Sequence, residues 1–507
     1  MNLMMLLEMA SSGFGDRVAL GSRDGSGLTY QELFDRAGAA AAYFEGAGID
    51  RVSLVDVSSP ALPIALFGAA WAGKPFAPLN YRLTADELRR LAAEVAPTVT
   101  ICDDHAQPKL WNVGGVQAVR RDEFLEEVAG AGVPAPEWSM DPDEIAILLY
   151  TSGTTGAPKA AVLRHKHLVS YILASVEFMG ADEDEATLIS VPPYHVAGMA
   201  AILSAVYAGR RIVQLPNFDA ADWVNVAVRE GITHAMVVPT MLARIVDHLE
   251  ASGIGTIPTL RTISYGGGKM PQPVIEKALD LLPHTAFVNA YGLTETSSTI
   301  CILGPEEHRA AQASTEPAAR RRLTSVGKPL PSIELSIRDE DGREVAPGNR
   351  GEIWVRGEQV SGEYLGRGSQ VNTEGWFPTK DGGYVDDEGY LFLEGRVDDI
   401  IIRGGENISP GEIEEVLLAH PAVSEAAAIG IPSRQWGEAV AAVVVLSSGT
   451  STSAEVLRDW VTQHLRSSRA PEHIEFRSEL PYNDMGKLLR RVLKSELAAR
   501  GDTESDT

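Results

Sequence analysis

The stretch "TYQELFDRAGAAAAYFEGAG" (29–48) is helix-like, and it is followed by the short apolar, β-rich run "VSLVDVS" (52–58). The same order returns where "ADWVNVAVREG" (221–231) precedes "HAMVVP" (234–239). Such alternation is typical of parallel sheets flanked by helices. We therefore predict an α/β fold, in which parallel-rich sheets build a large N-terminal domain.

The pattern of strand-like, helix-like and turn residues changes twice beyond residue 300. From Thr324 to Phe392, short strand-like runs are separated by turn residues, as in "IELSIRDEDGREVAPGNRGEIWVRG" (333–357), which predicts a β-rich subdomain. The segment after "GRVDDIIIRGGENISP" (395–410) has its own helix and strand patterns and predicts a small, mobile α+β domain. We place the large domain at 1–395, a hinge at 396–399 and the C-terminal domain at 400–507.

Composition and charge restrict the classes of function. A chain of 507 residues with 44% hydrophobic and 22% charged residues has the profile of an ordinary globular protein. Its formal net charge of −25 argues against binding of nucleic acid, because that binding requires clustered cations on the protein. Any anionic ligand must therefore meet a local site.

Cysteine usage and the N-terminus give expectations about location. Cys102 and Cys301 lie far apart without ligand-like neighbours, which favours neither a disulfide framework nor a thiolate metal site and fits a reducing cytoplasm. The opening "MNLMMLLEMASSGFGD" lacks a basic leader and a long apolar core. The apolar run 60–73 is shorter than the roughly 20 residues that span a bilayer. We expect a cytoplasmic protein without a membrane span, and a homodimer is left open.

The segment "LLYTSGTTGAPKAAV" (148–162) combines glycines, hydroxyl residues and a lysine directly after an apolar strand-like run. Glycines let the backbone approach an anion, hydroxyls and amides donate to it, and Lys159 adds a positive charge. The spacing differs from GxxxxGK[ST], so this is not a Walker A loop. The order of residues nevertheless predicts a phosphate-binding loop.

With this loop, the chain resembles the AMP-forming acyl- and aryl-CoA synthetases of the adenylate-forming superfamily, which also contains carrier-protein adenylation domains and luciferases. The resemblance continues, in the family's order, through "PPYHVAG" (192–198), "NAYGLTET" (289–296), "GEIWVRG" (351–357), "GWFPTKDGGYVDDEGYL" (375–391), "GRVDDIIIRGGENISPGEIE" (395–414) and "PYNDMGKLLRR" (481–491). It covers most of the chain. It implies an enzyme that uses ATP, Mg²⁺ and coenzyme A.

The resemblance implies catalytic roles for Lys487, Thr294 and Glu295, and Glu295 is also the expected Mg²⁺ ligand. Activating a carboxylate brings two anions together, so positive charge and positioned donors should carry most of the catalysis. The implied nucleotide-binding residues are Thr151, Ser152, Gly153, Thr154, Thr155, Gly156, Lys159, Gly267, Gly268, Asn289, Ala290, Tyr291, Gly292, Asp381 and Arg396. The residue before the ribose-binding aspartate is usually small in the family, whereas here it is Lys380.

Formation of the thioester requires a second arrangement, which the family reaches by rotating the small domain. Asp398 matches the hinge position. The implied contacts with CoA are Gly404, Gly405, Glu406, Trp436 and Arg469. Of the aromatic and basic run that relatives place before a proline to hold the CoA nucleotide, only Arg469 remains.

The acid itself is defined least. By resemblance the acyl pocket contains His195, Val196, Gly198, Tyr265, Gly266 and Met270. Three consecutive glycines (266–268) suggest a narrow slot for a planar ring or a thin chain, so a fatty or aromatic acid is expected. The alternatives are a ligase that loads a carrier protein and a relative that binds nucleotide without catalysis.

Overall fold

The computed structural model describes residues 1–24, 26–132, 135, 137–151, 158–254, 256–433, 435–483 and 488–504. The chain divides into two compact units, each considered by itself. The large unit comprises Met1–Glu334 and Val355–Phe377, and the small unit comprises Leu335–Trp354 and Pro378–Thr507. The predicted boundary at 396–399 stays a prediction.

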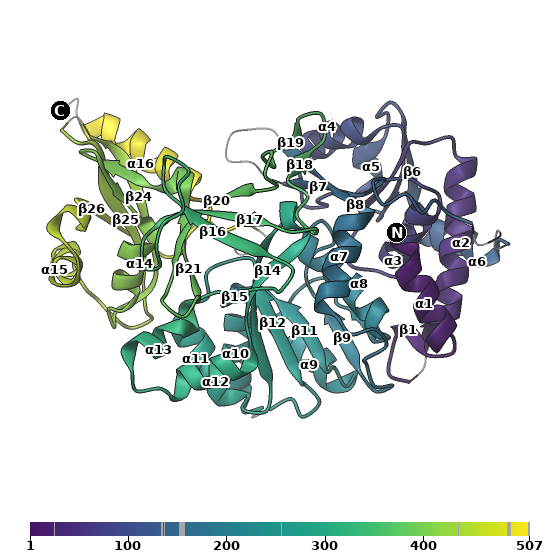
Figure 1. The fold of residues 1–507 in the computed structure, drawn as a ribbon, viewed down its shortest axis with the longest axis horizontal. Helices are drawn as coiled ribbons and strands as arrows, with labels where there is room; N and C mark the ends of the chain where they lie inside the picture. The colour runs from purple at the N-terminus through teal and green to yellow at the C-terminus, as the bar shows by residue number, and fades with distance from the viewer. Residues whose placement is uncertain are drawn as a thin grey trace. The chain divides into compact units, whose positions relative to one another are not determined.

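Two sheets organise the large unit among the described residues (Figure 1). The nine-stranded sheet has the order β15 (Lys328–Pro329), β14 (Ser298–Leu303), β13 (Ala286–Leu293), β12 (Thr262–Gly266), β11 (His234–Val237), β9 (Ala186–Ile189), β10 (Arg211–Gln214), β1 (Val18–Gly21) and β2 (Gly27–Thr29). The eight-stranded sheet has the order β19 (Gly368–Ser369), β18 (Glu363–Tyr364), β8 (Lys159–Arg164), β7 (Ile145–Thr151), β4 (Phe76–Pro78), β3 (Arg51–Val55), β5 (Thr98–Cys102) and β6 (Val116–Arg120).

The central pairs of both sheets are parallel, as the alternation predicts. Strand β12 pairs in parallel with β11 and β13, and β3 does so with β4 and β5. The helices of this unit are α1 (Met4–Phe14), α2 (Tyr30–Gly46), α3 (Ala61–Trp71), α4 (Ala85–Val95), α5 (Gln107–Leu110), α6 (Arg121–Gly130), α7 (His165–Ser175), α8 (Val196–Ala208), α9 (Ala220–Arg229), α10 (Pro239–Ser252), α11 (Gln272–Leu281), α12 (Pro305–Ala313) and α13 (Pro317–Arg321). Figure 1 shows α9 to α12 alongside β11 and β12.

Local sequence explains where helix α2 begins. The Thr29 side chain accepts a hydrogen bond from the backbone N–H of Glu32, and the Glu32 carboxylate accepts one from Thr29 N–H. This reciprocal capping box satisfies two donors that a helix start otherwise leaves unpaired. The segment 29–58 thus folds as predicted, as α2 followed by β3.

Helix α3 coincides with the apolar run 60–73, and every one of its residues is buried. It packs against α2, where Phe44 and Phe67 belong to the same core. Its apolar character on all sides is therefore that of a core helix. In the described part of the chain, no helix has both the length and the apolar character needed to cross a membrane.

The small unit contains two sheets among its described residues. The first has the order β16 (Glu334–Arg338), β17 (Gly351–Arg356), β20 (Phe377–Val385) and β21 (Leu391–Arg396). The second has the order β23 (Glu406–Ile408), β22 (Ile401–Arg403), β25 (Gly437–Leu446) and β24 (Val423–Ser433), and β26 (His473–Arg477) also pairs with β25. The helices are α14 (Pro410–Leu418), α15 (Ala454–His464) and α16 (Arg490–Glu504).

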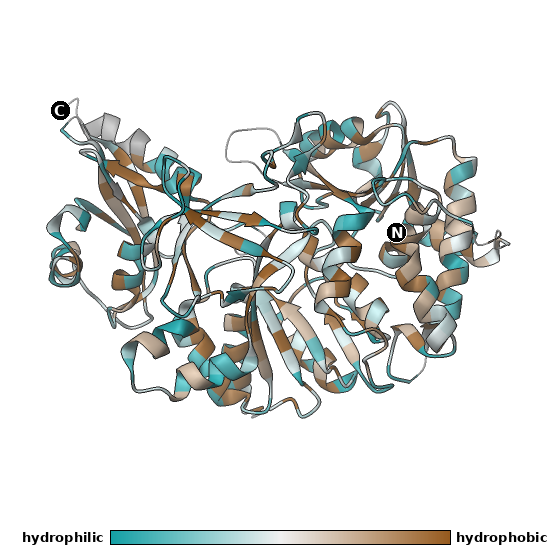
Figure 2. Ribbon diagram, viewed as in Figure 1, coloured by the Kyte–Doolittle hydropathy of each residue, from teal (hydrophilic) through white to brown (hydrophobic). Residues whose placement is uncertain are grey.

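The core of the small unit forms on both faces of β24 and β25. Figure 2 shows these strands as predominantly hydrophobic, and Val440, Ala442 and Val444 lie on one face while Ala441 and Val443 lie on the other. A strand buried on both faces reads as a continuous apolar run. The predicted α/β class with a small α+β C-terminal domain is confirmed, whereas the mobility of that domain stays a prediction.

Candidate functional site

In the large unit, the predicted site residues follow the carboxyl ends of neighbouring parallel strands. Gly266 ends β12 and stands beside Ala290 of β13, while His195 lies in the connection that follows β9. Because these parallel strands belong to one sheet, their carboxyl ends meet at one edge. Open α/β sheets bind ligands at this edge.

Two glycines at this edge are required by close backbone contacts. A Cβ on Gly266 would lie 2.1 Å from the carbonyl oxygen of Ala290, and a Cβ on Gly292 would lie 1.8 Å from that of Ser298. Real side chains do not tolerate such distances. Gly267 has a φ of +82°, which glycine adopts without steric cost. The backbone at these strand ends therefore leaves no room for a side chain at Gly266 or Gly292.

The nucleotide-binding set begins at the base of the glycine-rich loop. Thr151 and Lys159 stand opposite each other across the antiparallel pair β7 and β8, and the Thr151 hydroxyl donates to the Lys159 carbonyl at 3.4 Å. The residues Ser152, Gly153, Thr154, Thr155 and Gly156 lie outside the described residues. The pairing fixes both ends of the loop on a buried sheet.

Glu295 lies in the short 3₁₀ turn η1 (Thr294–Thr296), which directly follows β13. Its residue is only 9% exposed, and one carboxylate oxygen accepts a hydrogen bond from the Tyr364 hydroxyl. The Lys159 ammonium lies 5.7 Å from the centre of the Tyr364 ring. Tyr364 therefore connects two residues that the sequence assigns to phosphate and metal binding.

Tyr364 is a functional candidate that sequence reasoning missed. It lies in β18, which pairs with β8 through Tyr364 and Ala161. The backbone N–H groups of Ser361 and Gly362 in the same segment also donate to the Glu295 carbonyl, at 2.9 and 3.0 Å. The two strands are about 200 positions apart in sequence. No local sequence pattern predicts that they pair.

The donor set fits a magnesium ion held together with phosphate. No cluster of three or more potential metal ligands occurs among the described residues. Magnesium in nucleotide enzymes is typically bound by one or two carboxylates plus substrate phosphates and water. Glu295 supplies a single buried carboxylate of that kind.

The remaining residues of the predicted nucleotide and acyl sets are more enclosed. The Asn289 amide donates to the Ser325 carbonyl at 2.9 Å, and Tyr291 and Met270 are buried. Tyr265 has no exposed surface, and its hydroxyl lies 2.7 Å from His308 Nε2 in α12. Since His308 Nδ1 lies 2.7 Å from the Gly304 carbonyl, Nδ1 is the donor nitrogen and Nε2 accepts from Tyr265. The Tyr265 hydroxyl is committed to this contact.

His195 occupies the N-cap position of α8, where its side chain makes no capping hydrogen bond, and it packs beside an aromatic side chain. The rings of His195 and Tyr194 are 4.8 Å apart, and the Tyr194 ring lies 5.6 Å from that of Tyr81. A Cβ on Gly198 would lie 2.9 Å from the Pro192 carbonyl oxygen, so this helix start also requires glycine. Val196 is the first residue of the same helix.

In the small unit, Asp381 and Arg396 form a cross-strand pair. They stand opposite each other in β20 and β21, and Arg396 Nη1 donates to Asp381 Oδ1 at 3.0 Å. Asp398, the predicted hinge residue, is exposed in the 3₁₀ turn η3 (Val397–Asp399). Lys487 lies outside the described residues, between the described positions Asn483 and Leu488.

The predicted CoA residues meet around one turn of the small unit. Gly404 and Gly405 have φ of +59° and +84° between β22 and β23, and the Gly404 N–H donates to the Trp436 carbonyl at 2.7 Å. Arg469 donates to Glu406 at 2.8 Å and to Glu412 at 2.7 Å. The Ser468 hydroxyl, together with Arg469, holds the pKa of Glu406 below its usual range. The turn, its tryptophan and its arginine thus form one connected group.

Comparison with known proteins identifies the family of this chain. The family model described as "AMP-binding enzyme" matches residues 7–365, and the model described as "AMP-binding enzyme C-terminal domain" matches residues 412–487. The chain belongs to the AMP-binding enzyme family. The predicted class, an AMP-forming acid–thiol ligase of the adenylate-forming superfamily, is confirmed.

Relatives of this AMP-binding enzyme include ligases with two kinds of acceptor. A 2-succinylbenzoate–CoA ligase of Bacillus mycoides is 34% identical over 480 residues, covering 92% of this chain and 93% of the relative. A fatty acid–[acyl-carrier-protein] ligase, ScoC of Streptomyces coeruleorubidus, is 32% identical over 495 residues, covering 93% and 92%. The structure of o-succinylbenzoate CoA synthetase from Bacillus subtilis with its acyl-adenylate intermediate matches at a TM-score of 0.83 and 30% identity, covering 96% and 97%.

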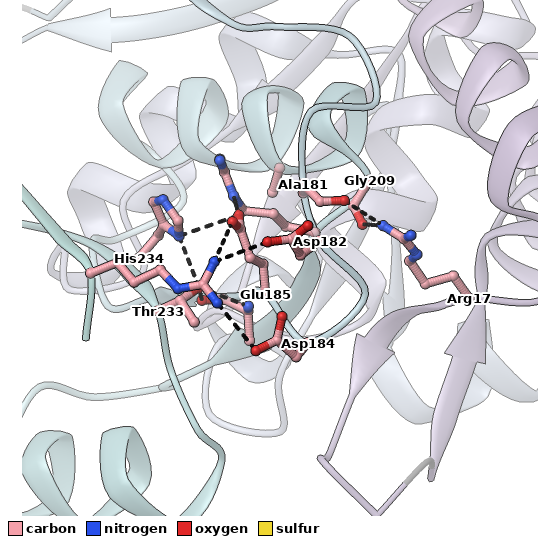
Figure 3. Close-up of polar contacts among 12 residues, drawn as sticks. Arg17, Ala181, Asp182, Asp184, Glu185, Gly209, Thr233 and His234 are labelled. Atoms are coloured by element: carbon pink, nitrogen blue, oxygen red, sulfur yellow. Dashed lines mark hydrogen bonds and ion pairs between the residues drawn. The ribbon is translucent and has the colours of Figure 1, made fainter. Parts of the chain in front are cut away.

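A second polar cluster of the AMP-binding enzyme lies at the opposite edge of the nine-stranded sheet (Figure 3). It surrounds the first residues of β9 and β11, so it is at the amino ends of the strands. The Arg261 guanidinium contacts Asp182, Asp184 and Glu185 at 3.3, 3.2 and 2.9 Å. Burial and the positive charge of Arg210 lower the pKa of His234 to about 4. The contacts of Arg261 join the segment before β12 to the segment before β9.

Proposed function

We propose that this chain is an ATP-dependent carboxylic acid:CoA ligase that forms an acyl-AMP and then an acyl-CoA thioester. The observation that carries the proposal is the contact of Tyr364 with both Glu295 and Lys159, next to the end of β13. It supplies one carboxylate and one cation for the phosphates that leave as pyrophosphate. The substrate that we propose is a fatty or aromatic acid.

The first half-reaction depends on charge placed where it develops. The carboxylate oxygen attacks the α-phosphorus, and the bond to pyrophosphate breaks. Mg²⁺, when bound, neutralises phosphate charge, and Glu295 is the residue that we propose holds it. Lys159 and the loop hydroxyls bind the departing phosphates. Asp381 accepts hydrogen bonds from the ribose hydroxyls, and Lys487 donates hydrogen bonds to the reacting oxygens.

The second half-reaction breaks the acyl–phosphate bond as a thiolate attacks the carbonyl carbon and AMP leaves. We propose that the turn of Gly404 and Gly405 lines the path of the pantetheine arm, because glycines permit close approach of a ligand. Trp436 is 37% exposed beside this turn, so it offers an apolar face to the arm. Asp398 serves as the hinge.

A ligase that loads a carrier protein is a second candidate, favoured by two observations. Arg469 is only 13% exposed at its side chain and is paired with two carboxylates, which weakens it as a ligand for a CoA phosphate. The relative ScoC is named as a ligase for an acyl carrier protein.

The intact residues Glu295, Asp381 and Lys487 disfavour a relative without catalysis. Both cysteines are buried free thiols, which supports the cytoplasm as the proposed location.

The acceptor is tested by offering CoA and a phosphopantetheine-bearing carrier protein separately, with ATP, Mg²⁺ and a panel of acids. Mass spectrometry of the thioester is the readout, and we expect the CoA thioester. The variant Gly404→Ala should slow thioester formation but leave pyrophosphate release unchanged, since its Cβ would meet the Trp436 ring at 3.0 Å.

The matched control is Gly449→Ala. Gly449 also has a left-handed backbone, with φ of +77°, but no atom lies within 4 Å of its added Cβ. It should form thioester at the normal rate. A thioester on the carrier protein alone would establish the second candidate, and equal loss in both alanine variants would remove the Gly404 turn from the proposed path.

A further inference from the structure

Lys380 has a backbone conformation that lysine rarely adopts. Its φ is +63°, in the left-handed region, within strand β20 and directly before Asp381. A side chain at such a position costs free energy that glycine avoids. The conformation therefore needs support from neighbouring groups.

Glu352 of the adjacent strand β17 supplies that support twice. Its Oε1 accepts a hydrogen bond from the backbone N–H of Lys380 at 3.2 Å, and the Lys380 ammonium lies 3.2 Å from the same oxygen. The Glu352 side chain is 18% exposed, against 52% for that of Lys380. One partly buried carboxylate thus binds both the backbone N–H and the side-chain ammonium of Lys380.

The residues on either side of Lys380 converge on Arg396. Its Nη1 donates to the Thr379 carbonyl at 3.3 Å and to Asp381 Oδ1 at 3.0 Å. The Thr379 hydroxyl donates to the Ile353 carbonyl at 2.8 Å and accepts from the Asp381 N–H at 3.1 Å. In a regular strand, neighbouring groups alternate between opposite faces. The left-handed residue turns the chain so that the carbonyl before it and the carboxylate after it share one guanidinium.

We propose that Lys380 and Glu352 are a positioning pair that holds the Asp381 carboxylate in the orientation that binds the nucleotide's ribose. The inference rests on the proposed function, because it takes Asp381 as the ribose ligand. Lys380 acts through its backbone conformation, and its ammonium forms an ion pair with the carboxylate of Glu352. Neither residue contacts the reacting atoms.

The pair should set the fraction of molecules in which Asp381 is ready to bind. Apparent affinity falls in proportion when this fraction falls. Alanine at position 380 keeps the steric cost and loses the ammonium anchor. Glycine loses the same anchor but has no steric cost, so the orientation stays accessible. Glycine should therefore rescue what alanine damages.

The test is binding of AMP to the full-length protein by isothermal titration calorimetry, without any acid. Lys380→Ala should weaken AMP binding by about tenfold, the equilibrium equivalent of a left-handed residue without support. Lys380→Gly should bind within about twofold of the wild type. Glu352→Ala should weaken binding like Lys380→Ala, and the double variant Glu352→Ala/Lys380→Gly should recover it.

The control is Arg343→Ala, which removes an exposed cation paired with Asp341 in the same unit and should leave AMP binding unchanged. Equal weakening by alanine and glycine at position 380 would overturn the proposal, since it would assign the effect to the lysine charge. Normal binding by Lys380→Ala would also overturn it. If Lys380→Ala does not fold, the comparison of Glu352→Ala with the double variant decides. AMP binding without turnover on any acid would refute the proposed function alone.

Discussion

The Glu295 carboxylate is held by a tyrosine hydroxyl that the nucleotide-binding motifs do not contain. Tyr364 donates to its carboxylate and places an aromatic face 5.7 Å from the Lys159 ammonium. The sequence predicts Glu295 and Lys159, because both lie in recognisable segments. Tyr364 could not be predicted, since its role arises only when β18 pairs with β8. The unusual Lys380 was visible in the sequence, but its left-handed backbone was not.

Removing the Tyr364 hydroxyl should weaken the metal-binding function of Glu295. We expect Tyr364→Phe to lower acid-dependent pyrophosphate release roughly tenfold at limiting Mg²⁺, because a hydrogen bond to a charged group contributes about 1.5–3 kcal/mol. Part of the loss should be recovered at high Mg²⁺. The measurement is a Mg²⁺ titration of the initial rate, with Tyr384→Phe as a control on a tyrosine of the small unit. An unchanged Mg²⁺ dependence would assign Tyr364 a packing role.

A buried histidine of α7 contacts the start of helix α1 in the large unit. The backbone N–H of Leu3 donates to His165 Nδ1 at 3.1 Å, at the first residue of α7. Burial, with the positive N-terminus, lowers the pKa of His165 to about 4. His167 accepts from the Arg164 N–H, and burial lowers its pKa to about 4 as well. Both imidazoles are therefore neutral acceptors in the folded protein at neutral pH.

This arrangement predicts a loss of stability in acid. The folded pKa of about 4 lies below the ordinary value of 6.5, so the unfolded chain binds protons first as the pH falls. The stability that depends on the neutral histidines is fully present above pH 6.5 and is lost as the pH falls toward 4. Protonation of each histidine should lower the free energy of unfolding by on the order of 3 kcal/mol over this range. Urea unfolding at pH 7 and pH 4.5 measures the change.

His165→Asn keeps an acceptor for the Leu3 N–H but cannot be protonated, so its stability should depend less on pH than that of the wild type. A wild-type curve that is flat between pH 7 and pH 4.5 would contradict the role given to these histidines. Identical slopes for the wild type and His165→Asn would remove His165 from that role.

At the level of helices and strands, sequence patterns predicted most of the fold. Helix α9 and strand β11 lie in the segments "ADWVNVAVREG" and "HAMVVP", and strands β24 and β25 lie in the C-terminal segment for which helix and strand patterns are predicted. These patterns succeed because an element that buries one face repeats apolar residues with the period of a helix or a strand, whereas a strand that is buried on both faces reads as a continuous apolar run. The order of strands within each sheet was not predictable in this way, because it depends on contacts between distant segments.

Across the whole molecule, the two units each have their own core and carry different parts of the proposed machinery. The phosphate-binding and metal-binding candidates belong to the large unit, whereas Asp381, Arg396 and the turn of Gly404 belong to the small unit. The predicted division instead assigns Asp381 to the large domain (1–395) and Arg396 to the hinge (396–399), and that division stays a prediction. The loop residues 152–156 and Lys487 lie outside the described residues, so their roles stay predictions.

The most direct measurement is acid-dependent release of pyrophosphate from ATP by the full-length protein, over a panel of aromatic and short to long fatty acids. At least one acid should release pyrophosphate with ATP and Mg²⁺ before any thiol is added. Lys487→Ala should lose this step yet form thioester from supplied acyl-AMP. Failure of every acid to release pyrophosphate would contradict the account, and equal loss of both half-reactions in Lys487→Ala would contradict the assignment of that lysine to the first step.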